Sequence, residues 1–190
     1  MIIYLHGFNS APASHKARCM AAYMQTRGQG GKFVCPELPH RPADAIALIE
    51  TELAKHLAAD VTLVGSSLGG FYATWLAEKH TCRAVLIQPA VNPHRGLESY
   101  IGIQKNLYTG AEYELTREHL LGWQALTVDS IDPERYLLLL ETGDEVLDYR
   151  EAVRKYEGAR MVIREGGDHM MQSFSEHLPR MLDFARFPAT

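Results

Sequence analysis

The residues best suited to chemistry surround Ser67, in the stretch 61–70 that reads VTLVGSSLGG. Its first four residues are apolar or β-branched and predict a short buried strand, and Phe71 to His80 predicts a helix after a tight turn. Gly65, Ser67 and Gly69 fit the pattern G-x-S-x-G, in which a serine occupies a strained turn and its hydroxyl projects above the edge of a sheet. The spacing therefore predicts that Ser67 is a nucleophile.

Three other interpretations of this stretch must be weighed. An ordinary glycine-rich turn between a strand and a helix would have the same composition, so the pattern alone leaves that alternative open. Ser66 is a second serine, but only Ser67 has glycines at both required offsets. A phosphate-binding loop is disfavoured because the sequence has neither the lysine of the Walker pattern nor G-x-G-x-x-G.

A serine hydroxyl is a poor nucleophile near neutral pH, so it needs a base that takes its proton and a carboxylate that orients the base. Asp144 follows the leucine-rich stretch 136–141, and His169 follows the predicted strand 160–164. Both residues come directly after strands, so they are expected at the same edge of the sheet as Ser67. Their order along the chain, serine, aspartate and histidine, fits a catalytic triad.

Each member of this triad has a competitor. Asp148 is a rival acid, although it could instead cap a helix that begins at Tyr149. Asp168 is adjacent to His169 in the chain, and side chains of adjacent residues usually point apart. His169 itself could be a solvated loop residue. His6 is expected to hold its loop by hydrogen bonds, and the remaining histidines are predicted to lie on the surface: His15, His40, His56, His80, His94, His119 and His177.

Acyl transfer through a serine also needs donors for the oxyanion that forms. Leu68 follows the nucleophile at a predicted helix start, where N–H groups lack partners within the helix. Phe8 follows His6-Gly7 after the predicted strand 2–5, which places a second N–H at the same edge. We therefore predict that the backbone N–H groups of Phe8 and Leu68 form the oxyanion hole; an ordinary turn after the first strand is the alternative.

Predicted strands and helices alternate along the chain. The strands are short, continuously apolar stretches, as expected for a sheet covered on both faces: residues 2–5, 32–35, 61–64, 83–87, 136–141 and 160–164. The helices are expected at residues 14–28, 43–58, 71–80, 149–156 and 175–187. This alternation predicts an α/β fold in which a sheet of about six mostly parallel strands is enclosed by helices in three layers.

Residues 92–135 do not fit this alternation. The segment contains scattered tyrosines and glycines, a plausible helix over 117–121 and little strand pattern. We interpret it as a small helical lid over the site, with an elaborated helical connection as the alternative. Four aromatic residues of the segment could line an acyl pocket or simply cover the core: Tyr100, Tyr108, Tyr113 and Trp123.

Composition restricts the class of protein. A chain of 190 residues is expected to form one domain over 1–190, and 22% charged residues with a net charge of −4 favour neither a nucleic-acid binder nor a membrane-surface binder. The sequence shows no signal peptide or membrane span, and its three cysteines, Cys19, Cys35 and Cys82, lack metal-ligand spacing. We expect free thiols, a cytoplasmic location, and neither a metal nor a cofactor.

Four motifs together resemble one known family. They are Leu5-His6-Gly7-Phe8-Asn9-Ser10 with Ser14 and Lys16, Gly65-Ser66-Ser67-Leu68-Gly69-Gly70, Thr142-Gly143-Asp144-Glu145-Val146-Leu147-Asp148-Tyr149, and Gly166-Gly167-Asp168-His169. The chain is similar over nearly its whole length to the small bacterial YqiA-type esterases, and least so over residues 92–135. This resemblance implies a trimmed α/β-hydrolase fold that hydrolyses carboxylic esters, with acyl-CoA thioesters also possible, through Ser67, Asp144 and His169.

The expected activity is therefore that of a serine esterase or thioesterase acting on a small-molecule acyl substrate. Two alternatives remain open. The same triad could cleave C–C or amide bonds, because a fold and a triad do not determine the leaving group. The chain could also be a binding protein that keeps the hydrolase shape without turnover, although an intact triad argues against this. The sequence does not specify the oligomeric state.

Overall fold

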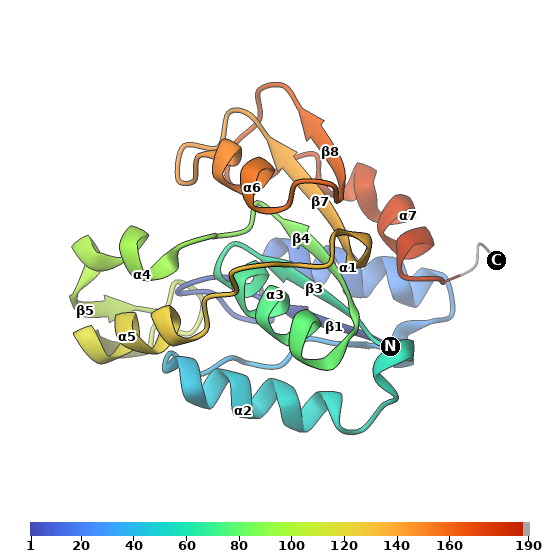
Figure 1. Ribbon diagram of the computed structural model, residues 1–190. Helices are drawn as coiled ribbons and strands as arrows, with labels where there is room; N and C mark the ends of the chain where they lie inside the picture. The colour runs from blue at the N-terminus through green and yellow to red at the C-terminus, as the bar shows by residue number, and fades with distance from the viewer. Residues whose placement is uncertain (188–190) are drawn as a thin grey trace.

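One parallel sheet dominates the computed structural model, which describes residues 1–187 (Figure 1). Within these residues, six strands pair in the order β2-β1-β3-β4-β7-β8, and every neighbouring pair is parallel. The strands are β1 (Ile2–Leu5), β2 (Phe33–Val34), β3 (Thr62–Ser66), β4 (Arg83–Ile87), β7 (Tyr136–Glu141) and β8 (Arg160–Arg164). The predicted strands are confirmed, although β2 is shorter than expected.

Helices cover both faces of this sheet. They are α1 (His15–Thr26), α2 (Pro42–Leu53), α3 (Leu68–His80), α4 (Pro93–Gly96), α5 (Arg117–Ala125), α6 (Tyr149–Lys155) and α7 (Phe174–Phe184). Short 3-10 helices lie at η1 (Gly30–Lys32), η2 (Ala58–Asp60), η3 (Glu98–Tyr100) and η4 (Pro133–Arg135). The helix expected over 43–58 is shorter than predicted, because α2 ends at Leu53 and η2 begins separately.

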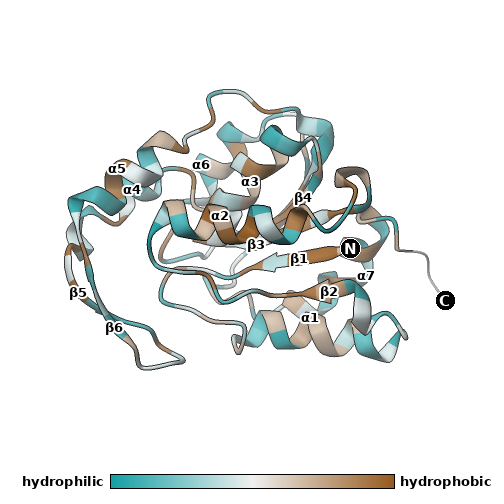
Figure 2. Ribbon diagram, turned by 90° about the horizontal axis from the view of Figure 1, so that it is seen from below, coloured by the Kyte–Doolittle hydropathy of each residue, from teal (hydrophilic) through white to brown (hydrophobic). Residues whose placement is uncertain are grey.

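Two apolar clusters hold the layers together. Alternate residues along each strand face opposite sides, so the buried side chains of Leu63 and Leu86 join one cluster while those of Val64 and Val85 join the other. The first cluster packs against α2, α3, α5 and α6, and the second against α1 and α7. Figure 2 shows the apolar faces of the helices turned toward the sheet. Burial on both faces explains why the strands read as continuous apolar runs.

The strand order places a crevice at the carboxyl ends of β1 and β3. The chain leaves β1 toward β2 on one side and returns to β3 on the other side of β1. Open α/β sheets bind ligands outside the carboxyl ends of the strands where the order reverses in this way. The loop that carries Phe8 follows β1 and the turn that carries Ser67 follows β3, so both predicted elements lie beside this crevice.

The segment 92–135 differs from the expectation of a purely helical insertion. It contains α4, η3 and α5, but also an antiparallel hairpin formed by β5 (Gly102–Lys105) and β6 (Glu112–Leu115). Figure 2 shows the hairpin as an arm that stands out from the sheet. The prediction of little β structure was wrong because both strands are only four residues long and half exposed, so they carry no continuous apolar run.

The cysteines are free thiols, as expected. Cys82 is buried, and Cys19 and Cys35 are partly buried. Burial raises the pKa of Cys35 to about 12 and that of Cys82 to about 11, so neither is a reactive thiolate near neutral pH. No helix in the described range 1–187 is long and apolar enough to cross a membrane.

Gly69→Ala tests the close contact between α3 and the end of β1. A Cβ at position 69 would overlap the carbonyl group of Leu5 and lie 2.7 Å from the carbonyl oxygen of His6. Both contacts are with backbone that cannot easily move, so we expect the free energy of unfolding to fall by about 3 kcal/mol. Urea denaturation measures this change. Gly31→Ala is the control because nothing lies within 4 Å of its Cβ position, and an equal loss in both variants would contradict the explanation.

Candidate active site

Ser67 occupies a strained turn between β3 and α3. Its φ and ψ are 54° and −119°, a region that residues other than glycine rarely adopt and that costs on the order of 1–3 kcal/mol. Its N–H donates to the carbonyl of Ile87 at 3.0 Å, and its own carbonyl accepts from the N–H groups of Gly70 and Ala90 at 2.9 and 3.1 Å. The Ser67 side chain makes no capping hydrogen bond to α3, so its hydroxyl is not used to begin the helix.

The glycines around Ser67 make this turn sterically possible. A Cβ on Gly65 would lie 2.6 Å from the Cα of Gly70, and one on Gly70 would lie 2.7 Å from the Cβ of Pro89. Gly7, in the loop after β1, is close enough that a Cβ there would lie 3.3 Å from the Cβ of Ser67. The G-x-S-x-G spacing therefore produces the sharp strand-to-helix turn, and the loop after β1 lies directly against it.

His169 and Asp144 are hydrogen-bonded to each other. The Nδ1 atom of His169 lies 2.8 Å from Oδ2 and 3.0 Å from Oδ1 of Asp144. An ionised carboxylate only accepts hydrogen bonds, so Nδ1 carries the proton and Nε2 is left as the basic nitrogen of the neutral ring. The exposed fractions are 18% for the side chain of His169 and 1% for that of Asp144. The imidazole thus reaches the cavity while the carboxylate stays behind it.

The surroundings of Asp144 favour its ionised form. Burial raises the pKa of Asp144, but hydrogen bonds from His169 and from the N–H groups of Leu147 and Val146 outweigh burial, so its pKa lies below the ordinary value of 3.8. The two N–H groups donate to Oδ1 at 2.8 and 2.9 Å. A carboxylate that is ionised and held at three points can orient an imidazole and stabilise its protonated form.

The ring of His169 contacts Asp144 and neither of the rival acids. Asp148 caps α6, because its Oδ1 accepts from the N–H of Arg150 at 3.0 Å. Asp168 contacts Gln172 through Oδ2 at 3.4 Å, and its backbone N–H donates to Glu141. The hydrogen bonds of His169 therefore single out Asp144 among the three aspartates near the turn and the loop.

Four of the five predicted site residues line one cavity of about 560 Å³. Ser67 and His169 both line it, as do Phe8 and Leu68. Leu68 is the first residue of α3, where backbone N–H groups have no acceptor within the helix. The rest of the wall has an apolar part, formed by Ala90, Val91, Pro93, Leu97, Tyr100, Val146 and Leu147, and a polar part formed by Asn92, Arg95, Asp148 and Glu151.

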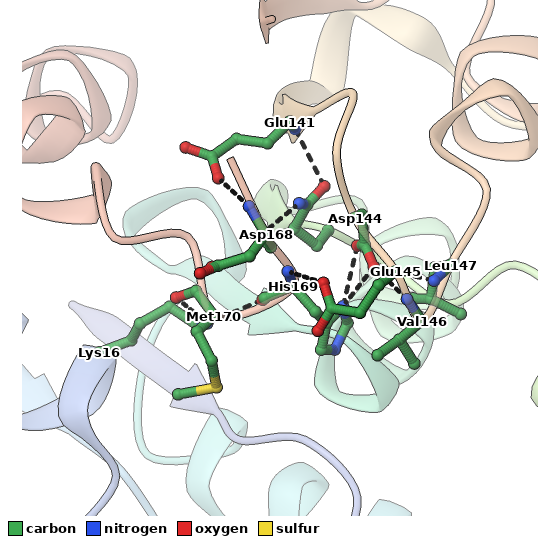
Figure 3. A network of polar contacts seen from close by, with 10 residues as sticks. Lys16, Glu141, Asp144, Glu145, Val146, Leu147, Asp168, His169 and Met170 are labelled. Carbon is green, nitrogen blue, oxygen red and sulfur yellow. Dashed lines mark hydrogen bonds and ion pairs between the residues drawn. The ribbon is translucent and has the colours of Figure 1, made fainter. Parts of the chain in front are cut away.

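The loop that carries His169 is held by side chains from outside it (Figure 3). Glu141 is buried, and its carboxylate accepts from the N–H of Asp168 at 2.9 Å. Glu145 is exposed, and its carboxylate accepts from the N–H of His169 at 3.0 Å. The amide of Gln88 donates to the carbonyl of Asp168 at 3.2 Å and accepts from the N–H of Glu141 at 3.1 Å.

A lysine completes this set of contacts. The ammonium group of Lys16 donates to the carbonyls of Met170 at 2.8 Å and His169 at 3.4 Å. Sequence reasoning assigned no role to Glu141, Glu145, Gln88 or Lys16. A signal was present for Glu141, because a charged residue ends a strand of leucines at a position where the sheet is buried.

His6 has the structural role that was predicted. Its Nε2 accepts from the N–H of Leu38 at 3.0 Å, and its Nδ1 lies 3.1 Å from the carbonyl of Gly7. A backbone N–H only donates, so Nε2 is unprotonated and Nδ1 is the donor. Burial lowers the pKa of His6, which favours this neutral form. His6 thus fixes the loop that leads to Phe8.

The prediction that His119 lies on the surface was wrong. Its exposed fraction is 2%, its Nε2 lies 2.9 Å from Nδ1 of His40, and its Nδ1 accepts from the N–H of Thr116 at 3.1 Å. The ring of His40 stacks on that of Tyr113 with centroids 4.3 Å apart. Over residues 1–187, no three histidine, cysteine, aspartate or glutamate residues come together in a way that could hold a metal ion.

The aromatic residues of the segment 92–135 divide between several places. Tyr100 lines the cavity that contains Ser67 and His169. Trp123 is in the core, where its indole N–H donates to the hydroxyl of Tyr72 at 2.7 Å. Tyr113 donates its hydroxyl hydrogen to Asn9 at 2.8 Å and faces a neighbouring cavity, while Tyr108 is at the tip of the hairpin.

The profile of the Uncharacterised protein family (UPF0227) matches residues 1–186. The chain belongs to the UPF0227 family. Its relatives include UPF0227 proteins of Serratia proteamaculans, 27% identical over 99% of this chain and 100% of that protein, and of Citrobacter koseri, 24% identical over 97% and 98%. The YqiA-type resemblance of the sequence motifs agrees with this membership.

Solved structures similar to this UPF0227 chain are α/β-hydrolases and esterases. Mouse alpha/beta hydrolase domain-containing protein 10 matches with a TM-score of 0.74 at 15% identity, over 96% of this chain and 87% of that one. Est1E from Butyrivibrio proteoclasticus, in a structure with ferulic acid bound, matches with a TM-score of 0.70 at 14% identity, over 98% and 89%. At these identities the likeness establishes the α/β-hydrolase fold.

Asp144→Asn tests the contact between Asp144 and His169 through stability. The folded-state pKa of Asp144 is below its unfolded value of about 3.9, so the carboxylate stabilises the fold above about pH 4 and this contribution is lost as the pH falls through the folded-state pKa. We expect the free energy of unfolding of Asp144→Asn to be about 1–2 kcal/mol below wild type at pH 7. Urea denaturation should show this difference narrowing below about pH 4.

Asp148→Asn is the matched control for this measurement. Asn caps a helix about as well as Asp, so this variant should stay within about 0.5 kcal/mol of wild type at pH 7. Equal losses in the two variants, or a difference for Asp144→Asn that does not depend on pH, would refute the assignment of Asp144 as the carboxylate that stabilises the loop.

Proposed function

We propose that this UPF0227 protein is a serine esterase or thioesterase. The observation that supports this most strongly is the bidentate contact of Asp144 with Nδ1 of His169, while His169 and Ser67 line one cavity. This arrangement leaves the basic Nε2 of His169 available on the side of the cavity. The strained turn adds to the argument, because it presents a serine hydroxyl that does not cap α3.

In the proposed reaction, Ser67 Oγ attacks the carbonyl carbon of an ester or thioester while Nε2 of His169 takes the hydroxyl proton. Asp144 keeps the imidazole oriented and stabilises its positive charge. The N–H groups of Phe8 and Leu68 hold the oxyanion of the tetrahedral intermediate. His169 then protonates the departing alcohol or thiol, and the carbon–oxygen or carbon–sulfur bond breaks to leave an acyl-enzyme.

Water releases the acyl group by the same chemistry in reverse order. His169 takes a proton from the water, the hydroxide adds to the acyl carbon, and Ser67 leaves with the proton that His169 returns to it. The protein supplies every group that these steps require. We propose that the apolar wall around Val91, Leu97 and Tyr100 receives the acyl group and that residues 92–135 serve as a lid on this side.

Ser67→Ala tests the proposal directly. We expect hydrolysis of p-nitrophenyl esters or acyl-CoA thioesters to fall by at least about 10³-fold, because the nucleophile is removed while the oxyanion donors remain. Labelling by a fluorophosphonate probe should be lost as well, since the probe forms a bond to an activated serine. The substrate that wild type prefers among the two classes distinguishes an esterase from a thioesterase.

Ser66→Ala is the control, because Ser66 is the neighbouring serine that lacks the flanking glycines at both offsets. This variant should keep both labelling and hydrolysis. If Ser67→Ala hydrolyses esters as fast as wild type, the proposed mechanism is wrong. If wild type neither labels nor hydrolyses any member of the panel, a binding protein with a hydrolase shape is the better interpretation.

A further inference from the structure

Lys16 is a buried cation beside the candidate active site. It is the second residue of α1, and the exposed fraction of the residue is 8%. Lysines are seldom this buried unless their ammonium group has partners. Its partners are the carbonyls of Met170 and His169, which lie more than 150 residues away in the chain, at 2.8 and 3.4 Å.

The loop around His169 needs such partners. It has no regular secondary structure through residue 172, and Gly166, Gly167 and Met171 all have positive φ. The peptide groups from Asp168 to Met170 therefore lie outside any helix or strand. The carbonyl of Asp168 accepts from the N–H of Met171 at 3.0 Å, and side chains from other elements make most of the remaining hydrogen bonds. Lys16 reaches the loop from α1, which belongs to the same apolar cluster as α7.

Lys16 also lies near several carboxylates. Burial lowers the pKa of Lys16, and the charges of Asp168, Asp144 and Glu141 act against this shift by favouring the ammonium form. The carboxylate of Glu145 lies close to the same loop, because it accepts from the N–H of His169 at 3.0 Å. Other titratable groups line a small cavity of about 180 Å³ that contains Lys16, Ser67 and His169: Tyr4, His6, His15 and Tyr108.

These charges surround His169, which is the general base in the proposed function. Asp144 contacts the imidazole of His169, while Glu141 and Glu145 accept from backbone N–H groups of the same loop. A general base must be neutral before it can take a proton. A positive charge at Lys16 opposes the carboxylates. It also restrains the two carbonyl groups that follow the His169 side chain, and so restrains where the ring can lie.

We propose that Lys16 is a positioning residue of this site, which holds the His169 loop through two carbonyl groups and sets a positive charge against the surrounding carboxylates. The inference rests on the proposed serine hydrolase function for its catalytic consequence. It assigns two separable effects to one side chain, a tether and a charge. Three substitutions separate them.

Lys16→Met removes both effects, Lys16→Gln keeps a hydrogen-bond donor without charge, and Lys16→Arg keeps the charge. The profile of kcat/KM against pH is the measurement. In Lys16→Met and Lys16→Gln the acid limb should move to higher pH by about one unit, since an opposing charge is lost, and kcat/KM at pH 6 should fall about tenfold. Lys16→Met also loses the donor, so its kcat/KM should in addition fall on the plateau above the acid limb, whereas Lys16→Gln should keep that plateau. In Lys16→Arg the acid limb should stay within about 0.3 unit of wild type.

The control is Lys55→Met, because Lys55 is an exposed lysine that pairs with Glu52 after α2, and it should leave the whole profile unchanged. A lysine with a purely structural role would give variants that lose stability and activity at every pH without moving the acid limb, and that result would overturn the proposal. If Lys16→Met does not fold, Lys16→Gln carries the same test, because its amide can still donate to a carbonyl.

A second readout does not depend on turnover. In the Ser67→Ala protein, the ring resonances of His169 can be followed by NMR as the pH changes, with and without Lys16→Gln. The midpoint of this titration should move upward by about one unit when the charge is removed. An unmoved midpoint refutes the proposal for Lys16, whereas an inactive wild type with a moved midpoint refutes the proposed function alone.

Discussion

The site depends on the close approach of the first turn of α3 to the carboxyl ends of β1 and β3. This approach is possible only because Gly65, Gly69 and Gly70 lack side chains, since a Cβ at any of them would overlap backbone or Pro89. It forces Ser67 into a positive φ and turns the serine hydroxyl away from helix capping. The same contact places Gly7 and Phe8 beside the serine. One steric constraint thus locates both the proposed nucleophile and the proposed oxyanion donors.

The histidine is located in a different way. Hydrogen bonds with four polar side chains hold the loop that carries His169. They are Glu141 of β7, Glu145 of the turn after β7, Gln88 after β4 and Lys16 of α1. Three of these side chains, those of Glu141, Gln88 and Lys16, are buried, and buried polar groups stabilise a structure only when nearly all of them have partners. The proposed base is therefore coupled to the charge state of its surroundings, whereas the proposed nucleophile is fixed by backbone sterics. Lys16 can therefore act on the proposed base through its charge and its hydrogen bonds, as inferred above, without changing the turn that holds Ser67.

Much of this arrangement follows from local sequence patterns. The apolar runs located the sheet strands, with the two-residue β2 shorter than expected, and the glycine spacing around Ser67 located the turn, because buried strands and tight turns impose requirements on neighbouring residues. The fact that Asp144 and His169 each follow a strand was enough to predict that they meet. Long-range contacts were not accessible in this way. Nothing in the sequence near Lys16 indicates that it reaches the carbonyl of Met170, and the hairpin β5–β6 has no apolar run to reveal it.

A crystal structure of the protein after reaction with a phosphonate inhibitor tests the central claim most directly, because the phosphorus centre imitates the tetrahedral intermediate. The account predicts a covalent bond from phosphorus to Oγ of Ser67 and one phosphonyl oxygen between the N–H groups of Phe8 and Leu68. It also predicts that Nε2 of His169 faces the adduct while Nδ1 keeps its contact with Asp144. Phosphorus bound to another residue, or an imidazole turned away from the adduct and separated from Asp144, would contradict it.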